Sequence, residues 1–170
     1  MPIDNFNHTI DIWINELHRY NFTQLCTKPN PNSWSLGQVY MHVISQTSYY
    51  IEQIAVCVST NDHWAEEASP GAKKMFLANA FPNELIEGPP SNADTPQPTS
   101  KEQLAIDLIA LKSKMGVVVA TMEKSIYHGK TRHPGLHYFS ASDWLQFTDM
   151  HLRHHLRQKE RVDAFLGMGE

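Results

Sequence analysis

The chain has 170 residues, and its 14 Lys and Arg against 18 Asp and Glu give a formal net charge of −4 at pH 7. This length predicts a single domain over residues 1–170. The acidic balance excludes the broad cationic face that binds nucleic acid or an anionic membrane, so neither is an expected partner. The ten histidines are the unusual feature. They indicate either a response to pH or imidazoles held neutral for a purpose such as metal binding.

The sequence shows no sign of export or membrane insertion. No stretch approaches the ~18 apolar residues of a membrane span. Residues 1–17 carry three acidic side chains and lack an apolar region behind a basic start. Cys26 and Cys57 stand alone, which supports neither a disulfide framework nor a zinc ribbon. We therefore expect a soluble, cytoplasmic protein.

Two amphipathic helices are predicted in the first third of the chain. Apolar residues recur at steps of three and four over residues 7–26, and this helix should end before Pro29. A second helix should open at Ser35, where Gln38 completes a capping box, and run to about residue 59.

Residues 61–99 are predicted to form a long connection, because six of the ten prolines fall there. A short helix over about residues 70–80 is expected inside it, with Ser69 as its cap. A loop this long either argues against the assignment of these elements or covers a functional site, and we favour the cover. We expect its apolar residues to pack on the rest of the chain: Met75, Phe76, Leu77, Phe81, Leu85 and Ile86.

The second half of the chain predicts two more long helices. One opens at a capping box from Ser100 to Gln103 and runs to about Tyr127, and the other runs from about Ser140 to Gly167. No strand with convincing alternation is found. The predicted fold is therefore all-α, a four-helix bundle with a long crossover connection between its second and third helices.

The last helix carries a histidine pattern with metal-binding spacing. His151 and His155 are four residues apart, so they project from one helix face with Cβ atoms about 5–6 Å apart. Two imidazoles at that spacing can share one first-row metal ion. His154 lies about 100° round the helix and is a poorer ligand. Gln158 continues the face one turn further and could hydrogen-bond a ligand or water.

A third ligand should come from another helix that faces the same core. His42 is the best candidate, because it lies on the second helix along a largely apolar stripe. The alternative is that His42 is a core histidine with a hydrogen-bonding neighbour, and that His151 and His155 are surface residues. The apolar pattern of the last helix continues through the histidine turn, which favours metal binding.

Two separated motifs resemble the DinB-like superfamily. The segment from Trp34 to Ile44, WSLGQVYMHVI, resembles its second-helix signature, and the order His, three residues, His, then Gln resembles its final helix. Leu156 and Arg157 depart from the family pattern, which often has Arg and Gly there. These departures leave the ligand positions intact and put substrate contacts in question.

The resemblance implies a four-helix bundle, metal ligands His42, His151 and His155, and a homodimer. It implies a divalent metal ion, zinc or nickel first. It also implies a small-molecule substrate and activity as a transferase that uses a low-molecular-weight thiol, or as a hydrolase. Nearby residues that could support the metal or line a substrate pocket are His154, Gln158, Tyr50 and His133.

The chemistry stays open at this point. Leu152 follows His151 where metalloproteases have a glutamate base, which argues against peptide hydrolysis. Glu52, Asp149 and His154 remain as acid or base candidates. The alternatives to a metal-dependent enzyme are a metal-binding helical bundle without turnover, with a stress-related binding role, and a pH-responsive helical module.

Overall fold

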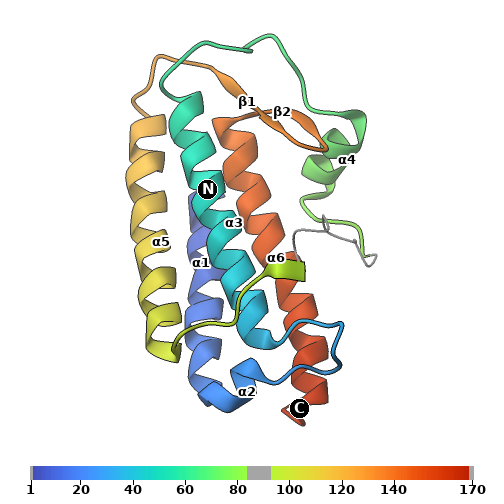
Figure 1. The fold of residues 1–170 in the computed structure, drawn as a ribbon. Helices are drawn as coiled ribbons and strands as arrows, with labels where there is room; N and C mark the ends of the chain where they lie inside the picture. Colours follow the sequence, from blue (N-terminus) through green and yellow to red (C-terminus); the bar gives the residue numbers. More distant parts are fainter. Residues whose placement is uncertain (1, 84–92, 169–170) are drawn as a thin grey trace.

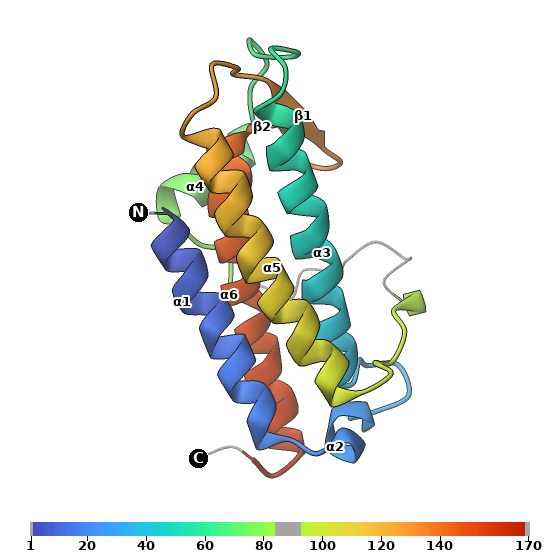
Figure 2. The same ribbon diagram turned by 90° about the vertical axis from the view of Figure 1, so that its left-hand side faces the viewer.

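Four long helices dominate the structure, a computed structural model that describes residues 2–83 and 93–168. They lie side by side (Figures 1 and 2), with α3 and α1 each packed on both α5 and α6. Their bounds are α1 (Pro2–Glu16), α3 (Leu36–Cys57), α5 (Lys101–Met122) and α6 (Ala141–Phe165). Helix α5 ends five residues before the predicted Tyr127.

Hydrogen-bonded caps fix where the helices begin. The Ser35 hydroxyl accepts from the backbone N–H of Gln38, and the Gln38 side chain accepts from the Ser35 N–H, which confirms the predicted capping box of α3. Ser100 caps α5 through the N–H of Gln103. The reciprocal bond is missing, because the Gln103 side chain donates instead to Asp107 at 2.8 Å. The second capping box was therefore only half right.

The prediction of one continuous helix over residues 7–26 was wrong. Helix α1 begins at Pro2 and is followed by the 3₁₀ turn η1 (Leu17–Arg19), extended backbone at Tyr20, and the short helix α2 (Phe22–Cys26). Asn21 forms a capping box with Gln24, with both bonds at 2.9 Å. This local bonding starts a new helix instead of continuing the old one.

A small hairpin precedes α6, so the prediction that the chain contains no strand was also wrong. Strands β1 (Lys130–His133) and β2 (His137–Ser140) pair antiparallel, with Lys130 opposite Ser140 and His133 opposite His137. Four residues are too few to show a period-two pattern in the sequence. The chain is predominantly helical with a two-stranded sheet, rather than all-α.

In the described part of the connection between α3 and α5, three of the predicted apolar residues pack against the core. The connection contains α4 (Pro70–Ala78), which Ser69 caps, so the short helix is confirmed. Met75, Phe76 and Phe81 pack on the core. The same prediction was wrong for Leu77, whose side chain faces solvent on α4 and is 88% exposed. Leu85 and Ile86 lie outside the described residues.

The core is apolar and continuous across the helices. It is built from aromatic and branched side chains, and Trp13, Tyr40 and Trp144 are fully buried in it. Trp13 and Tyr40 meet edge to face with ring centroids 4.9 Å apart. None of the described helices has the length and hydropathy to cross a membrane.

Candidate metal centre

Three imidazoles converge between α3 and α6. One ring nitrogen from each of His42, His151 and His155 lies within 4.8 Å of the others. The His42 ring centroid is 5.3 Å from that of His151 and 4.7 Å from that of His155. The structure therefore brings together the three residues that the sequence pattern selected as a ligand set.

The spacing of the nitrogens fits a shared metal ion. The Nε2 atoms of His151 and His155 are 3.1 Å apart. Two nitrogens that each bind one ion at about 2.0–2.1 Å, with an angle of about 90–110° between the bonds, are roughly 2.9–3.4 Å apart. This donor set of three imidazoles is compatible with a divalent first-row metal ion.

The second nitrogens of the two α6 histidines differ in their surroundings. The Nδ1 atom of His155 is 2.7 Å from Oε1 of Gln158. A proton on Nδ1 leaves the Nε2 lone pair of His155 free to face the shared point. The Nδ1 atom of His151 is buried without a hydrogen-bond partner among the described residues. Gln158 was predicted to support the site, and its contact with His155 is consistent with that role.

Burial keeps these imidazoles neutral, the form in which they bind metals. It lowers the pKa of His42 to about 4 and the pKa of His155 to about 3. The pKa of His151 also falls well below its usual value, first through burial and then through the neighbouring histidines. The lone pairs are thus available at neutral pH without competition from protons.

Aromatic side chains enclose the histidines. The ring of Tyr50, which is 4% exposed, meets His151 edge to face with centroids 5.5 Å apart. The ring centroid of Trp34 lies 4.9 Å from that of His42. Phe81 comes from the long connection, and its ring centroid lies 6.2 Å from that of His151 and 5.3 Å from that of His154. The connection therefore helps to cover the histidine cluster.

His154 lies beside the cluster and does not join it. Its Nδ1 is 3.1 Å from Nη2 of Arg157. Because a guanidinium can only donate, this Nδ1 accepts and the proton of the neutral ring sits on Nε2. Burial, then the charges of Arg157 and Arg161, lowers the pKa of His154. His154 is thus a poor proton acceptor.

His133 lies one layer further away. Its ring packs in an aromatic cluster with Phe139, Trp144 and Phe147, at centroid distances of 5.2, 5.7 and 5.1 Å. Its Nδ1 accepts from the backbone N–H of Gly135 at 3.1 Å. Burial lowers its pKa to about 4. His133 supports the wall behind Phe147.

The two carboxylate candidates for acid or base chemistry are poorly placed for it. Asp149 is buried and accepts from the Thr9 hydroxyl at 2.6 Å and from Nε of Arg153 at 2.9 Å, so it joins α6 to α1. Glu52 is exposed on α3. Arg153 also donates to the backbone oxygen of Asn79 at 2.9 Å, which commits it to structure.

Sequence reasoning missed one charge near the site. Arg161 lies on α6 seven residues after His154, and its positive charge lowers the pKa of both His154 and His155. Residues seven apart on a helix share a face, so the spacing could have identified it. Together with Arg157, it gives this side of the site a positive potential.

Comparison with known families supports this reading of the two motifs. Residues 5–158 match the DinB superfamily, and this range spans both histidine motifs. The chain belongs to the DinB superfamily. No match is found among curated proteins or solved structures. As a DinB-superfamily member, the chain has a helical fold and a histidine cluster compatible with a divalent metal ion.

Proposed function

We propose that this protein binds one divalent metal ion through His42, His151 and His155, and that it acts as a metal-dependent enzyme on a small molecule. The observation that carries the proposal is the convergence of three imidazole nitrogens within 4.8 Å, two of them on buried side chains. In the same proposal the four long helices form the four-helix bundle expected from the sequence, in the cytoplasm.

The ion, zinc or nickel first, would supply Lewis acidity that lowers the pKa of a bound water toward ~7 or holds a bound thiol as its thiolate. The three histidines would hold it as neutral ligands, and Gln158 would orient His155. Tyr50 and Phe81 would exclude water from one side.

The charges around the site favour a thiol over a water as the activated group. Arg157 and Arg161 lie near His154, so an anion that approaches from that side is stabilised. A thiol and a water must each lose one proton to become the nucleophile, and a thiol, with a pKa of about 8.5 against about 15.7 for water, gives that proton to the solvent more readily. His154 and Asp149 are both engaged in other contacts. We therefore place a thiol-dependent transferase ahead of a hydrolase.

Elemental analysis of protein purified without an affinity tag tests the metal part of the proposal. We expect close to one zinc or nickel ion per chain, and loss of that ion in His155→Ala. His154→Ala is the matched control, because this neighbouring histidine lies outside the cluster. Protein that retains no divalent ion, or retains it in His155→Ala, contradicts the proposal.

The thiol part is tested with cobalt-loaded protein. A small thiol that reaches an open coordination position produces a sulfur-to-cobalt charge-transfer band in the near ultraviolet. No band with any small thiol argues against a thiol-dependent transferase.

The second candidate is a metal-binding helical bundle without turnover, with a stress-related binding role. It is favoured by the absence of a free proton acceptor among the described residues around the cluster: Asp149 binds Thr9 and Arg153, and His154 binds Arg157. A large fall in melting temperature with chelator, together with no thiol band, would support this candidate.

A further inference from the structure

Tyr50 is buried beside the histidine cluster, on the side of α3 that packs on α6. Its side chain is 4% exposed. The ring stacks on Trp144 with centroids 5.4 Å apart, and it meets Phe147 and His151 edge to face at 5.4 and 5.5 Å. Long side chains on a helix lean toward its N-terminus. We therefore expect the phenol of Tyr50 to extend toward the end of α3 that carries His42.

The hydroxyl of Tyr50 has no hydrogen-bond partner among the described residues, unlike those of the two other buried tyrosines. The Tyr40 hydroxyl donates to the backbone oxygen of Trp13 at 3.0 Å, and the Tyr20 hydroxyl donates to Asp163. A buried phenol usually finds an acceptor for its proton. Tyr50 is thus a donor for a molecule that enters beside the histidine cluster.

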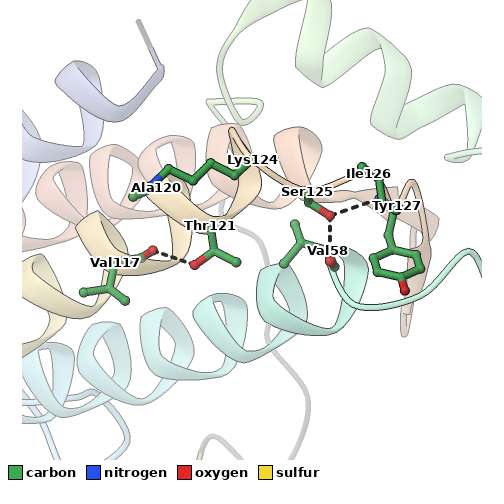
Figure 3. A pocket seen from close by; sticks show the side chains of 8 residues that line it. All are labelled: Val58, Val117, Ala120, Thr121, Lys124, Ser125, Ile126 and Tyr127. Carbon is green, nitrogen blue, oxygen red and sulfur yellow. Dashed lines mark hydrogen bonds between the residues drawn. The ribbon is translucent and has the colours of Figure 1, made fainter.

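Hydroxyl groups in the apolar groove between the ends of α3 and α5 differ from that of Tyr50. The groove has a volume of about 550 Å³ (Figure 3). Thr121 donates to the backbone oxygen of Val117 at 3.1 Å, and Ser125 donates to that of Val58 at 2.7 Å. Both hydroxyls are thus satisfied within the chain. The groove therefore lacks the unpartnered buried donor that Tyr50 provides at the cluster.

The charges around the cluster favour an anion as the acceptor. The guanidinium charges of Arg157 and Arg161 both act on His154, and that of Arg161 also acts on His155. No carboxylate of the described residues bonds to any of the three ligand histidines, and the nearby Asp149 is held by other side chains. An incoming anion therefore meets positive potential without an opposing negative charge beside the imidazoles.

We propose that Tyr50 determines which small molecule binds at the metal centre: its hydroxyl donates to one oxygen of a carboxylate whose other oxygen faces the three histidines. The inference rests on the proposed function, because that second oxygen needs the ion held by the histidines. A carboxylate is an anion with two acceptor oxygens on one carbon, so it suits both the positive potential and the paired sites. The aromatic rings of Trp144 and Phe147 keep the surroundings of Tyr50 apolar, which strengthens such a hydrogen bond.

Anion binding to the cobalt-loaded full chain tests the role of Tyr50. Visible absorption of the bound cobalt reports the entry of an anion, and the probes are acetate and chloride. Tyr50→Phe removes only the hydroxyl and should weaken acetate binding about tenfold or more, because a hydrogen bond to a charged acceptor is lost. Chloride is a single atom and cannot serve the ion and the hydroxyl together, so its affinity should stay as in wild type.

Tyr49→Phe is the matched control, because it removes a hydroxyl from the next residue of α3, which is 36% exposed. It should bind acetate as wild type does. If wild type binds cobalt but no acetate, or if Tyr50→Phe binds acetate as tightly as wild type, the inference is overturned while the metal site stands. An equal loss of acetate and chloride in Tyr50→Phe overturns it too. A wild-type chain that binds no cobalt overturns the proposed function and this inference together.

Thermal melting of the metal-free chain gives a second measurement that needs no ion. Tyr50→Phe should leave the melting temperature unchanged, because no bond within the chain is lost. Tyr40→Phe should lower it by about 2–4 °C, because the bond to the Trp13 oxygen is lost. An equal fall in the two variants would mean that the Tyr50 hydroxyl bonds within the protein, which overturns the inference.

Discussion

The Nδ1 atom of His155 lies 2.7 Å from Oε1 of Gln158, one turn further along α6. This contact sets which nitrogen of His155 carries its proton, and so whether Nε2 can bind a metal ion. Gln158→Leu should therefore lower metal affinity about 10–100-fold while the three ligands remain. Competition with a zinc indicator measures this. Gln158→Glu keeps an oxygen acceptor for the His155 Nδ1 proton and should bind the ion nearly as well as wild type. If Gln158→Leu binds the ion as tightly as wild type, the contact does not contribute to metal affinity.

Acid should destabilise the metal-free protein through its buried histidines. Burial lowers the folded-state pKa of both His42 and His133 from 6.5 to about 4. Between these values the unfolded chain binds protons that the folded chain does not, so the free energy of unfolding falls as pH falls. The slope from pH 6.5 to 5 should approach about 1.4 kcal/mol per pH unit for each such histidine.

Urea unfolding in chelator at several pH values measures this slope, and His133→Asn supplies the comparison. Because His133→Asn removes one titrating group, the pH dependence of the free energy of unfolding should be less steep by the contribution of one histidine. A stability that is flat from pH 6.5 to 5 would mean that these imidazoles titrate normally in the folded protein.

A buried ion network at the far end of α6 should contribute strongly to stability. Lys159 is 4% exposed and donates to Glu16 at 2.7 Å and to Asp163 at 2.6 Å, and Asp163 also accepts from the Tyr20 hydroxyl. Burial and the bond to Asp163 raise the pKa of Tyr20 to about 12, so its hydroxyl keeps its proton.

Lys159→Met should cost about 3–5 kcal/mol, because it leaves the Asp163 carboxylate buried without its cation. The double variant with Asp163→Leu should recover part of that loss. Denaturant unfolding measures both. If Lys159→Met lowers the free energy of unfolding by less than about 1 kcal/mol, Lys159 contributes no more than a typical surface ion pair, which contradicts the prediction.

Gly37, in the first turn of α3, should not tolerate a side chain. A Cβ at this position would lie 2.8 Å from the backbone oxygen of Leu25 and 2.8 Å from the ring of Pro98. Gly37→Ala should therefore destabilise the protein by about 1–3 kcal/mol, as overpacking does. Gly71→Ala is the matched control, because its nearest neighbour would be 3.9 Å away. Thermal melting compares the two, and equal melting temperatures would contradict the close approach.

Helix starts and the ligand set were accessible from the sequence because their signals are local. The capping box joins Ser35 to Gln38, which are only three residues apart. His151 and His155 lie on one face because residues four apart in a helix always do. His42 could be chosen because it lies on an apolar stripe that had to face the other helices.

The remaining features depend on contacts between distant residues. The hairpin is too short for alternation to reveal it, and part of what holds it is the bond from Trp144 Nε1 to Thr131 at 2.7 Å. The ties of Asp149 to Thr9 on α1 and of Lys159 to Glu16 link residues 140 and 143 positions apart in the chain. Patterns within one helix carry no sign of them.

The metal site is tested most directly by isothermal titration calorimetry, in which zinc is added to protein that has been treated with chelator. We expect one ion per chain, loss of that binding in each of His42→Ala, His151→Ala and His155→Ala, and its retention in His154→Ala. Absence of stoichiometric binding in wild type, or four variants that behave alike, would contradict the assignment of these three histidines as a metal site.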